Sequence, residues 1–365
     1  SGFTGSNGTL LVGQTETCLW TDGRYFIQAE KELEGTGIFL QKMGEKNVKS
    51  IGEYLKDKVQ DGENIGFDGK VVTAAFGRKL EEVLADKQVG FFYGEDLADE
   101  LWIDRPTFKQ NDILIWQDEM ALFGQTTTEK LKSVREQMEK VQVSALVLSK
   151  LDDIMWLYNI RGKDVDCNPV AFSFSIVTMA ETYLFVGGQV IDGKLLAKAQ
   201  KDGLTLKPYD SFLDSLKTLN LGEKIWLCEN STPYAVYKCF DKDSLYIKAN
   251  PTERLKAVKN EAEIQNIRDF YIKDSVAVTK FIYKIKKERE NIAQGKNITE
   301  YDAMLMMDSL RESIPGYLDK SFTTISAYGE NAAMMHYEAT KEVCAVIKNE
   351  GMLLVDSGSQ YTGAT

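Results

Sequence analysis

The sequence predicts a mixed α/β (α+β) fold of three successive units, over residues 1–125, 126–252 and 253–365. In each of the first two units, a short run of β character is followed by a glycine turn and then by a helix. These runs share Glu-Thr-x-Leu and an aromatic end at an offset of 165 positions, from Glu16 to Glu181, which indicates a duplicated unit. The third unit differs, because it begins with a long helix and ends in strands.

The first unit opens with a glycine-rich stretch and two expected strands, at 9–12 and 17–21. The pair Asp22-Gly23 then predicts a turn, after which a helix is expected to begin near Tyr25. Two more helices are expected over 50–58 and 72–84.

The second unit is expected to begin with a helix that Thr128 caps. Leu131, Val134 and Met138 follow at helical spacing and predict its buried face. Strands are expected at 144–148, 172–177 and 182–186, and helices at 151–157, 194–202 and 211–218.

The third unit contains a capping pair, Asn260 and Glu263, ahead of a helix that should reach about residue 288. Thr299 is expected to cap a second helix, which ends before Pro315. Strands are expected at 323–327, 343–347 and 352–355.

Composition excludes several classes of protein. The 44 Lys and Arg against 55 Asp and Glu give a net charge of −11, which argues against a nucleic-acid partner. The chain has one histidine, so no site can use several histidine ligands from it. Its most apolar stretch, 170–180, is well short of the ~20 residues of a membrane helix, so no membrane partner is expected. Five scattered cysteines indicate a reducing compartment, the cytoplasm.

Two side chains near the end of the chain are candidates for chemistry. Asp356 ends an apolar strand and precedes Ser-Gly, a position that suits a metal ligand or a catalytic acid. An Asx turn explains the same pattern, and local sequence alone favours that alternative. His336 could move a proton near neutral pH, or it could be a structural histidine of the core.

Short motifs are spread through the whole chain: Ser1-Gly-Phe-Thr-Gly-Ser, Trp20-Thr-Asp-Gly-Arg24-Tyr-Phe, Trp156-Leu-Tyr-Asn-Ile-Arg161-Gly-Lys-Asp164, Asn168-Pro-Val, Lys256-Ala-Val-Lys-Asn, Phe322-Thr-Thr-Ile-Ser, Asn331-Ala-Ala-Met-Met-His336-Tyr and Val355-Asp356-Ser-Gly-Ser-Gln-Tyr361. In this order they closely resemble the cytosolic Xaa-Pro aminopeptidase (aminopeptidase P) family of pita-bread metallopeptidases.

This resemblance implies two tandem creatinase N-terminal-like domains followed by the first part of a pita-bread catalytic domain. It further implies removal of the N-terminal residue from peptides with proline in position two, two divalent metal ions (usually Mn²⁺) and a homodimer. By match, Asp356 would be a metal ligand, and His336 would be the catalytic residue beside the scissile bond and a substrate contact. Arg24 would contact the peptide from the first domain.

The match is incomplete. The family's site uses two Asp, one His and two Glu as metal ligands, and of these only Asp356 has a counterpart here. The family also has a stretch before the residue that matches Ser1. We therefore expect a chain truncated at both ends, which by itself holds no metal pair and is inactive. Two alternatives remain: a pita-bread module that binds peptides or proteins without metal, and a prolidase or creatinase relative, which usually has one N-terminal domain.

Overall fold

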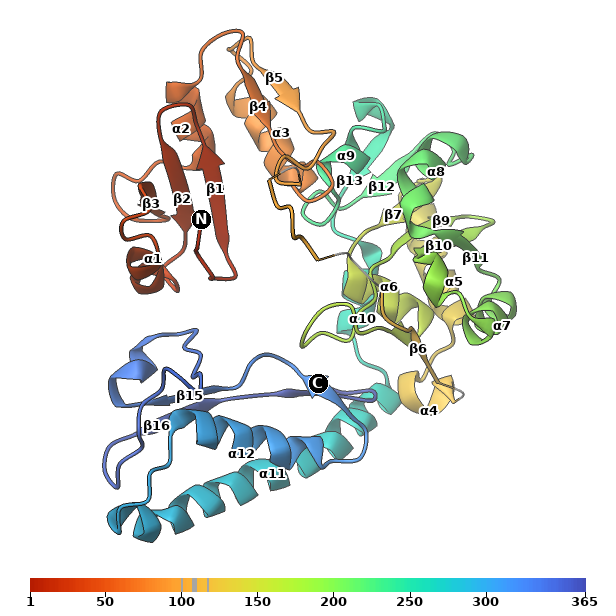
Figure 1. Ribbon diagram of the computed structural model, residues 1–365. Helices are drawn as coiled ribbons and strands as arrows, with labels where there is room; N and C mark the ends of the chain where they lie inside the picture. Colours follow the sequence, from red (N-terminus) through yellow and green to blue (C-terminus); the bar gives the residue numbers. More distant parts are fainter. Residues whose placement is uncertain (100, 107–109, 117) are drawn as a thin grey trace.

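The chain folds into three units that follow one another along a crescent, in a computed structural model that describes residues 1–99, 101–106, 110–116 and 118–365 (Figure 1). The second unit lies between the other two along the chain, and the first and third units both lie on the same side of it. Two α/β units followed by a third, mixed unit confirm the predicted fold class. The unit boundaries at 125 and 252 stay a prediction.

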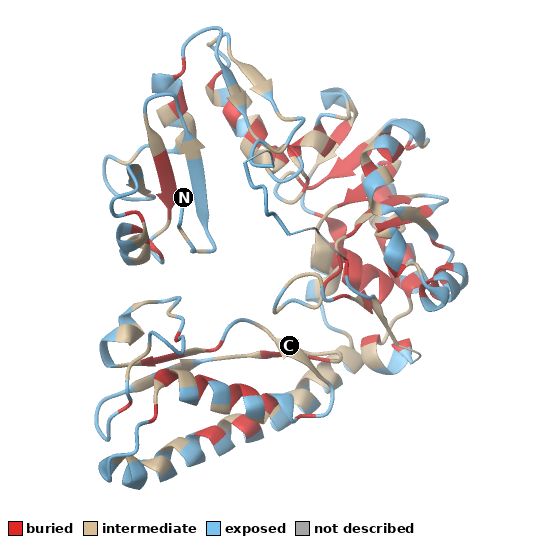
Figure 2. Ribbon diagram, viewed as in Figure 1, coloured by how far each residue is buried: buried red, intermediate tan, exposed pale blue. Residues whose placement is uncertain are grey.

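The first unit contains a sheet of order β1-β2-β3 and a separate parallel pair, β4-β5. β2 is buried, whereas β1 is largely exposed (Figure 2). The expected strands and helices are present. The elements are β1 (Gly8–Val12), β2 (Thr17–Thr21), α1 (Phe26–Glu32), β3 (Ile38–Lys42), α2 (Ile51–Lys58), β4 (Asn64–Gly66), α3 (Ala74–Val83) and β5 (Gly90–Phe92).

The second unit is built on a six-stranded sheet of order β11-β10-β9-β7-β12-β13. Along β7, Leu146 and Leu148 enter one core cluster, and Ala145 and Val147 enter another, as the two-residue period of a strand requires. The sheet is therefore buried on both faces (Figure 2). Two elements lie before residue 126: β6 (Leu114–Ile115), which pairs with β8, and α4 (Glu119–Phe123). The elements after it are α5 (Thr127–Lys140), β7 (Ala145–Leu148), α6 (Leu151–Tyr158), β8 (Ile160–Arg161), β9 (Phe174–Thr178), β10 (Thr182–Val186), α7 (Gly193–Asp202), β11 (Thr205–Pro208), α8 (Phe212–Thr218), β12 (Ile225–Leu227), α9 (Tyr234–Tyr237), β13 (Leu245–Ile247) and α10 (Pro251–Ala257).

The backbone confirms the predicted duplication. In the hairpin β1–β2, Val12 pairs with Thr17, and in the hairpin β9–β10, Val177 pairs with Thr182, so both positions repeat at the same offset of 165. Each hairpin is followed by a helix and then by a strand parallel to its second strand, β3 or β11. The copies differ in how their strands join: β7 pairs with both β9 and β12, whereas β1 and β4 belong to separate sheets.

The third unit consists of two helices packed on two antiparallel strand pairs, β14–β17 and β15–β16. Buried Phe281 and Met307 join the helices to this core. Asn260 and Thr299 cap the two helices, as predicted, and each forms a capping box, Asn260 with Glu263 and Thr299 with Asp302. The elements are α11 (Glu261–Ala293), α12 (Glu300–Glu312), β14 (Tyr317–Lys320), β15 (Ile325–Tyr328), β16 (Leu353–Asp356) and β17 (Ser359–Tyr361).

Two local predictions were wrong. Thr126, not Thr128, caps α5, because Thr126 forms a reciprocal capping box with Glu129. Residues 343–347 form no β-strand. In the described part of the chain, Val346 makes an isolated antiparallel β-bridge with Thr299. Among the described residues, no helix is both long and apolar enough to cross a membrane.

Candidate active site

The loop that carries His336 is organised by a buried carboxylate, Glu300, at the start of α12. Glu300 accepts hydrogen bonds from the amide of Tyr328 (2.5 Å), the amide of Ala345 (2.6 Å), the hydroxyl of Tyr337 (2.6 Å) and the side chain of Asn331 (3.0 Å). Burial alone raises the pKa of Glu300, but these donors outweigh it and hold that pKa below its usual value. Glu300 thus ties both ends of the loop to one ionised group.

His336 lies on this loop between two of the residues that Glu300 binds, Asn331 and Tyr337. A backbone hydrogen bond from Tyr337 to Met334 (3.2 Å) closes a turn around it. The His336 side chain itself is exposed. The loop backbone is therefore fixed from inside the third unit, while the imidazole projects out of it.

Arg24 lies in the turn between β2 and α1 of the first unit. Its Nε and Nη2 groups each donate to Asp22 at 2.8 Å, and Asn7 donates to the same carboxylate at 2.5 Å. The bonds from Arg24 and then Asn7 hold the pKa of Asp22 far below its usual range. The Arg24 Nη1 group makes no hydrogen bond to any described residue, so it remains available to a ligand.

The next residue, Tyr25, joins the first unit to the third. Its ring stacks on the His336 imidazole, with centroids 5.2 Å apart and planes at 29°. The Arg24 guanidinium lies 5.3 Å from the centroid of the same ring. Two of the predicted site residues, Arg24 and His336, are therefore brought together through Tyr25, although they lie in different units.

Asp356 ends β16, where it pairs with Ile325 of β15. Its side chain is exposed, and its carboxylate has no hydrogen bond or ion pair with a described residue. The Asp356 carboxylate therefore forms no Asx turn with the described residues. Asp356 presents a free oxygen ligand on a strand of the third unit, the unit that also carries His336.

A pair of metal ions needs more ligands than the described residues bring together. Divalent metals in catalytic pairs are held by several carboxylate or imidazole ligands together. Among the described residues, no group of three or more His, Cys, Asp or Glu side chains is arranged to hold an ion. Asp356 suits a metal chemically, but the described residues alone do not fit a di-nuclear site.

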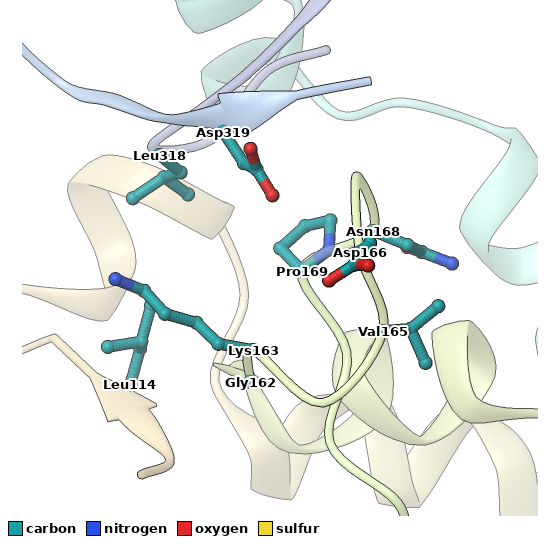
Figure 3. Close-up of a pocket in the computed structure, with 9 residues that line it drawn as sticks. All are labelled: Leu114, Gly162, Lys163, Val165, Asp166, Asn168, Pro169, Leu318 and Asp319. Carbon is teal, nitrogen blue, oxygen red and sulfur yellow. The ribbon is translucent and has the colours of Figure 1, made fainter. Parts of the chain in front are cut away.

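The second and third units meet at a cavity of about 240 Å³ (Figure 3). Asp319 of β14 accepts a hydrogen bond from the amide of Cys167 (3.2 Å), and Gln360 of β17 donates to the carbonyl of Cys167 (3.1 Å). These bonds fix the third unit against the loop after β8. The lining residues are Leu114, Gly162, Lys163, Val165, Asp166, Asn168, Pro169, Leu318 and Asp319.

Sequence reasoning missed Tyr25 and Glu300 as site residues. Tyr25 directly follows Arg24 in the motif Trp20-Thr-Asp-Gly-Arg24-Tyr-Phe, so the same motif could have indicated that Tyr25 lies at the site. Glu300 follows the capping residue Thr299, where an acidic residue is explained by the helix dipole alone. Only the folded loop shows what Glu300 binds.

Comparison with protein families finds three successive matches along the chain. Residues 1–95 and 104–263 each match a creatinase/prolidase N-terminal domain, and residues 265–365 match metallopeptidase family M24. The two N-terminal matches agree with the duplication seen in the backbone.

Several known proteins are similar over the whole chain. Xaa-Pro aminopeptidase 1 of Dictyostelium discoideum is 33% identical, and aminopeptidase P2 of Arabidopsis thaliana is 32% identical. Both alignments include 100% of this chain but only 59% and 55% of the relative. The X-prolyl aminopeptidase of Caenorhabditis elegans, described as a cytosolic enzyme with a di-nuclear active site, superposes with a TM-score of 0.92 at 31% identity, over 100% of this chain and 60% of that one. The chain thus spans somewhat more than half the length of these relatives.

Proposed function

The chain belongs to the Xaa-Pro aminopeptidase P family of M24 metallopeptidases, and we propose that the whole protein removes the N-terminal residue from peptides whose second residue is proline. One observation of this structure carries the proposal. Arg24 and His336, which the family resemblance assigns to substrate binding and catalysis, both lie against the Tyr25 ring.

The proposed roles follow from the chemistry of the two side chains. An Xaa-Pro bond has no N–H on its proline nitrogen, and the ring fixes the backbone angle φ, so the enzyme must recognise an unusual peptide shape. His336, exposed at the tip of a braced loop, donates a hydrogen bond or a proton to the reacting peptide. Arg24 uses its free Nη1 group to hold a peptide oxygen, since a guanidinium donates in a fixed plane.

We also propose that Asp356 is one ligand of a pair of divalent ions, with Mn²⁺ as the expected metal. The support is its free carboxylate at a strand end and the di-nuclear active site of the C. elegans relative. The other ligands would come from outside the described residues. A metal pair, when bound, supplies a hydroxide at neutral pH and polarises the scissile carbonyl.

The deciding experiment is a peptidase assay of the whole protein with and without added Mn²⁺. Release of the first residue from an Xaa-Pro-Xaa tripeptide, in preference to an Xaa-Pro dipeptide, supports the proposal. Preference for the dipeptide would instead make the protein a prolidase. A matched Xaa-Ala-Xaa tripeptide is the control for specificity toward proline.

A second candidate, which the family resemblance leaves open, is a pita-bread module that binds peptides without metal. Isothermal titration of a proline-containing tripeptide into the protein separates the two functions. Binding of the tripeptide without cleavage, at any Mn²⁺ concentration, would favour the binding module over the enzyme.

We propose a cytoplasmic location and a homodimer as well. The location is supported by the description of the C. elegans relative as cytosolic. The homodimer rests on the family resemblance, and sedimentation of the purified protein tests it directly.

A further inference from the structure

The packing around Tyr25 is fixed by its own unit, independently of His336. The Tyr25 hydroxyl lies 2.5 Å from the hydroxyl of Ser6, and the ring of Phe3 meets the Tyr25 ring edge-on at 6.0 Å and 90°. Tyr25 is only 2% exposed. One face of a firmly held ring is therefore presented to the third unit.

His336, in contrast, is an exposed side chain on a loop. The loop backbone is held by Glu300, but the imidazole has no other ring contact and no hydrogen bond among the described residues. An exposed side chain with free rotation samples several rotamers, each with the ring pointing elsewhere. The Tyr25 ring is the element that selects one of them, because stacking fixes the plane of the imidazole.

We propose that Tyr25 is a positioning residue for His336, through which the first unit completes the active site of the third. The effect of this positioning on catalysis rests on the proposed function. The stack reaches across the interface between two units, so their approach and the orientation of the imidazole are coupled. The first unit is then a working part of the site.

His336 is the single histidine of the 365 residues, which makes this directly measurable. In the whole protein with selectively labelled histidine, the imidazole NMR signals that disappear in His336→Gln are those of His336. We expect nuclear Overhauser contacts between the Tyr25 ring protons and Hδ2 or Hε1 of His336 in the wild-type chain. We also expect the His336 signals to carry an aromatic ring-current shift.

Two matched variants isolate the ring. Tyr25→Phe keeps the stacked ring and removes only the hydroxyl, so it should retain the ring-current shift. Tyr25→Leu keeps an apolar side chain and removes the ring, so it should lose that shift. Unchanged His336 signals in Tyr25→Leu, or no ring-to-ring contact in the wild-type chain, would overturn the proposal; the wild-type measurement holds even if Tyr25→Leu fails to fold.

Kinetics on the whole protein complete the test. We expect Tyr25→Leu to lower kcat about two- to tenfold with a smaller effect on KM, and Tyr25→Phe to restore kcat. An unchanged kcat in Tyr25→Leu overturns the positioning role. A wild-type protein that leaves Xaa-Pro peptides intact overturns the proposed function instead. In that case the NMR spectra still show whether His336 stacks on Tyr25, so the two failures can be told apart.

Discussion

Tyr337 directly follows His336 in the chain, and its hydroxyl donates a 2.6 Å hydrogen bond to the buried carboxylate of Glu300. The same carboxylate binds the amides of Tyr328 and Ala345, which lie on either side of the His336 loop. The strands of the third unit and this loop therefore share one anchor. Removing this carboxylate should destabilise the third unit, since several part-buried donors would lose their partner at once.

We expect Glu300→Ala to lower the free energy of unfolding of the third unit by about 3 kcal/mol, because several part-buried donors lose their partner together and each unsatisfied donor costs about 1 kcal/mol. Glu312→Ala, at the exposed end of the same helix, should change it by less than about 0.5 kcal/mol. Urea denaturation measures both. Since folding lowers the pKa of Glu300, its contribution should be present at neutral pH and fade as pH falls below the usual glutamate range.

A second prediction concerns the contact between the first and second units, where Gly77 of α3 packs on Tyr234 of α9. A Cβ at Gly77 would lie 2.1 Å from the Tyr234 ring, which leaves no room for a methyl group. Gly77→Ala should therefore destabilise the chain by about 1–3 kcal/mol. Gly52→Ala is the matched control in α2, because its nearest neighbour would be at 3.6 Å. If both variants melt at the wild-type temperature, the packing of α3 on α9 is misassigned.

Local features of this fold could be predicted from the sequence, whereas contacts between its units could not. The duplication was readable because Glu-Thr-x-Leu repeats at the positions that later prove to share a hairpin register. Helix starts at Asn260 and Thr299 were readable because capping is local. The pairs Gly77–Tyr234 and Tyr25–His336 depend on how whole units approach one another, which no local pattern encodes.

The same distinction applies to the site. His336, Asp356 and Arg24 stood out through motifs, yet nothing in those motifs gives their distances or partners. The strand expected at 343–347 is absent because backbone groups of these residues bond elsewhere: Val346 makes an isolated bridge with Thr299, and the amide of Ala345 donates to the Glu300 carboxylate. Tertiary hydrogen bonds took over residues that a strand pattern also suits.

Lys130 gives a third prediction, on pH. It is 1% exposed and donates to the carbonyl of Trp156 (2.9 Å) and to Asn159 (2.6 Å). Burial lowers the pKa of Lys130 to about 7, well under its value in the unfolded chain. Between about pH 7 and pH 10 the unfolded state then binds more protons than the folded state, so Lys130 makes stability rise with pH over that window.

We expect this rise to reach at most about 1.4 kcal/mol per pH unit, the limit for one proton. Lys130→Met should flatten it, and Lys132→Met, at an exposed position of the same helix, should leave it unchanged. Chemical denaturation from pH 7 to 9 measures the slopes. Identical slopes in wild type and Lys130→Met would contradict the prediction.

A fourth prediction tests the proposed metal ligand. Asp356→Ala in the whole protein should reduce the Mn²⁺ bound per chain, because a carboxylate ligand is lost. His336→Ala is the matched comparison and should bind as much Mn²⁺ as wild type. Elemental analysis after dialysis gives both numbers. Equal activity of Asp356→Ala and wild type at limiting Mn²⁺ would count against the ligand assignment.

The fifth prediction concerns His336 itself. If its imidazole donates a hydrogen bond or proton to the reacting peptide, His336→Ala should lower kcat about a hundredfold or more, the usual range for a general acid or base. Its effect should exceed that of Tyr25→Leu, because Tyr25 acts only through the imidazole that His336→Ala removes. In the double variant, Tyr25→Leu should then add nothing further, since coupled residues are not additive. An additive loss in the double variant would mean that Tyr25 serves the site by a route other than His336.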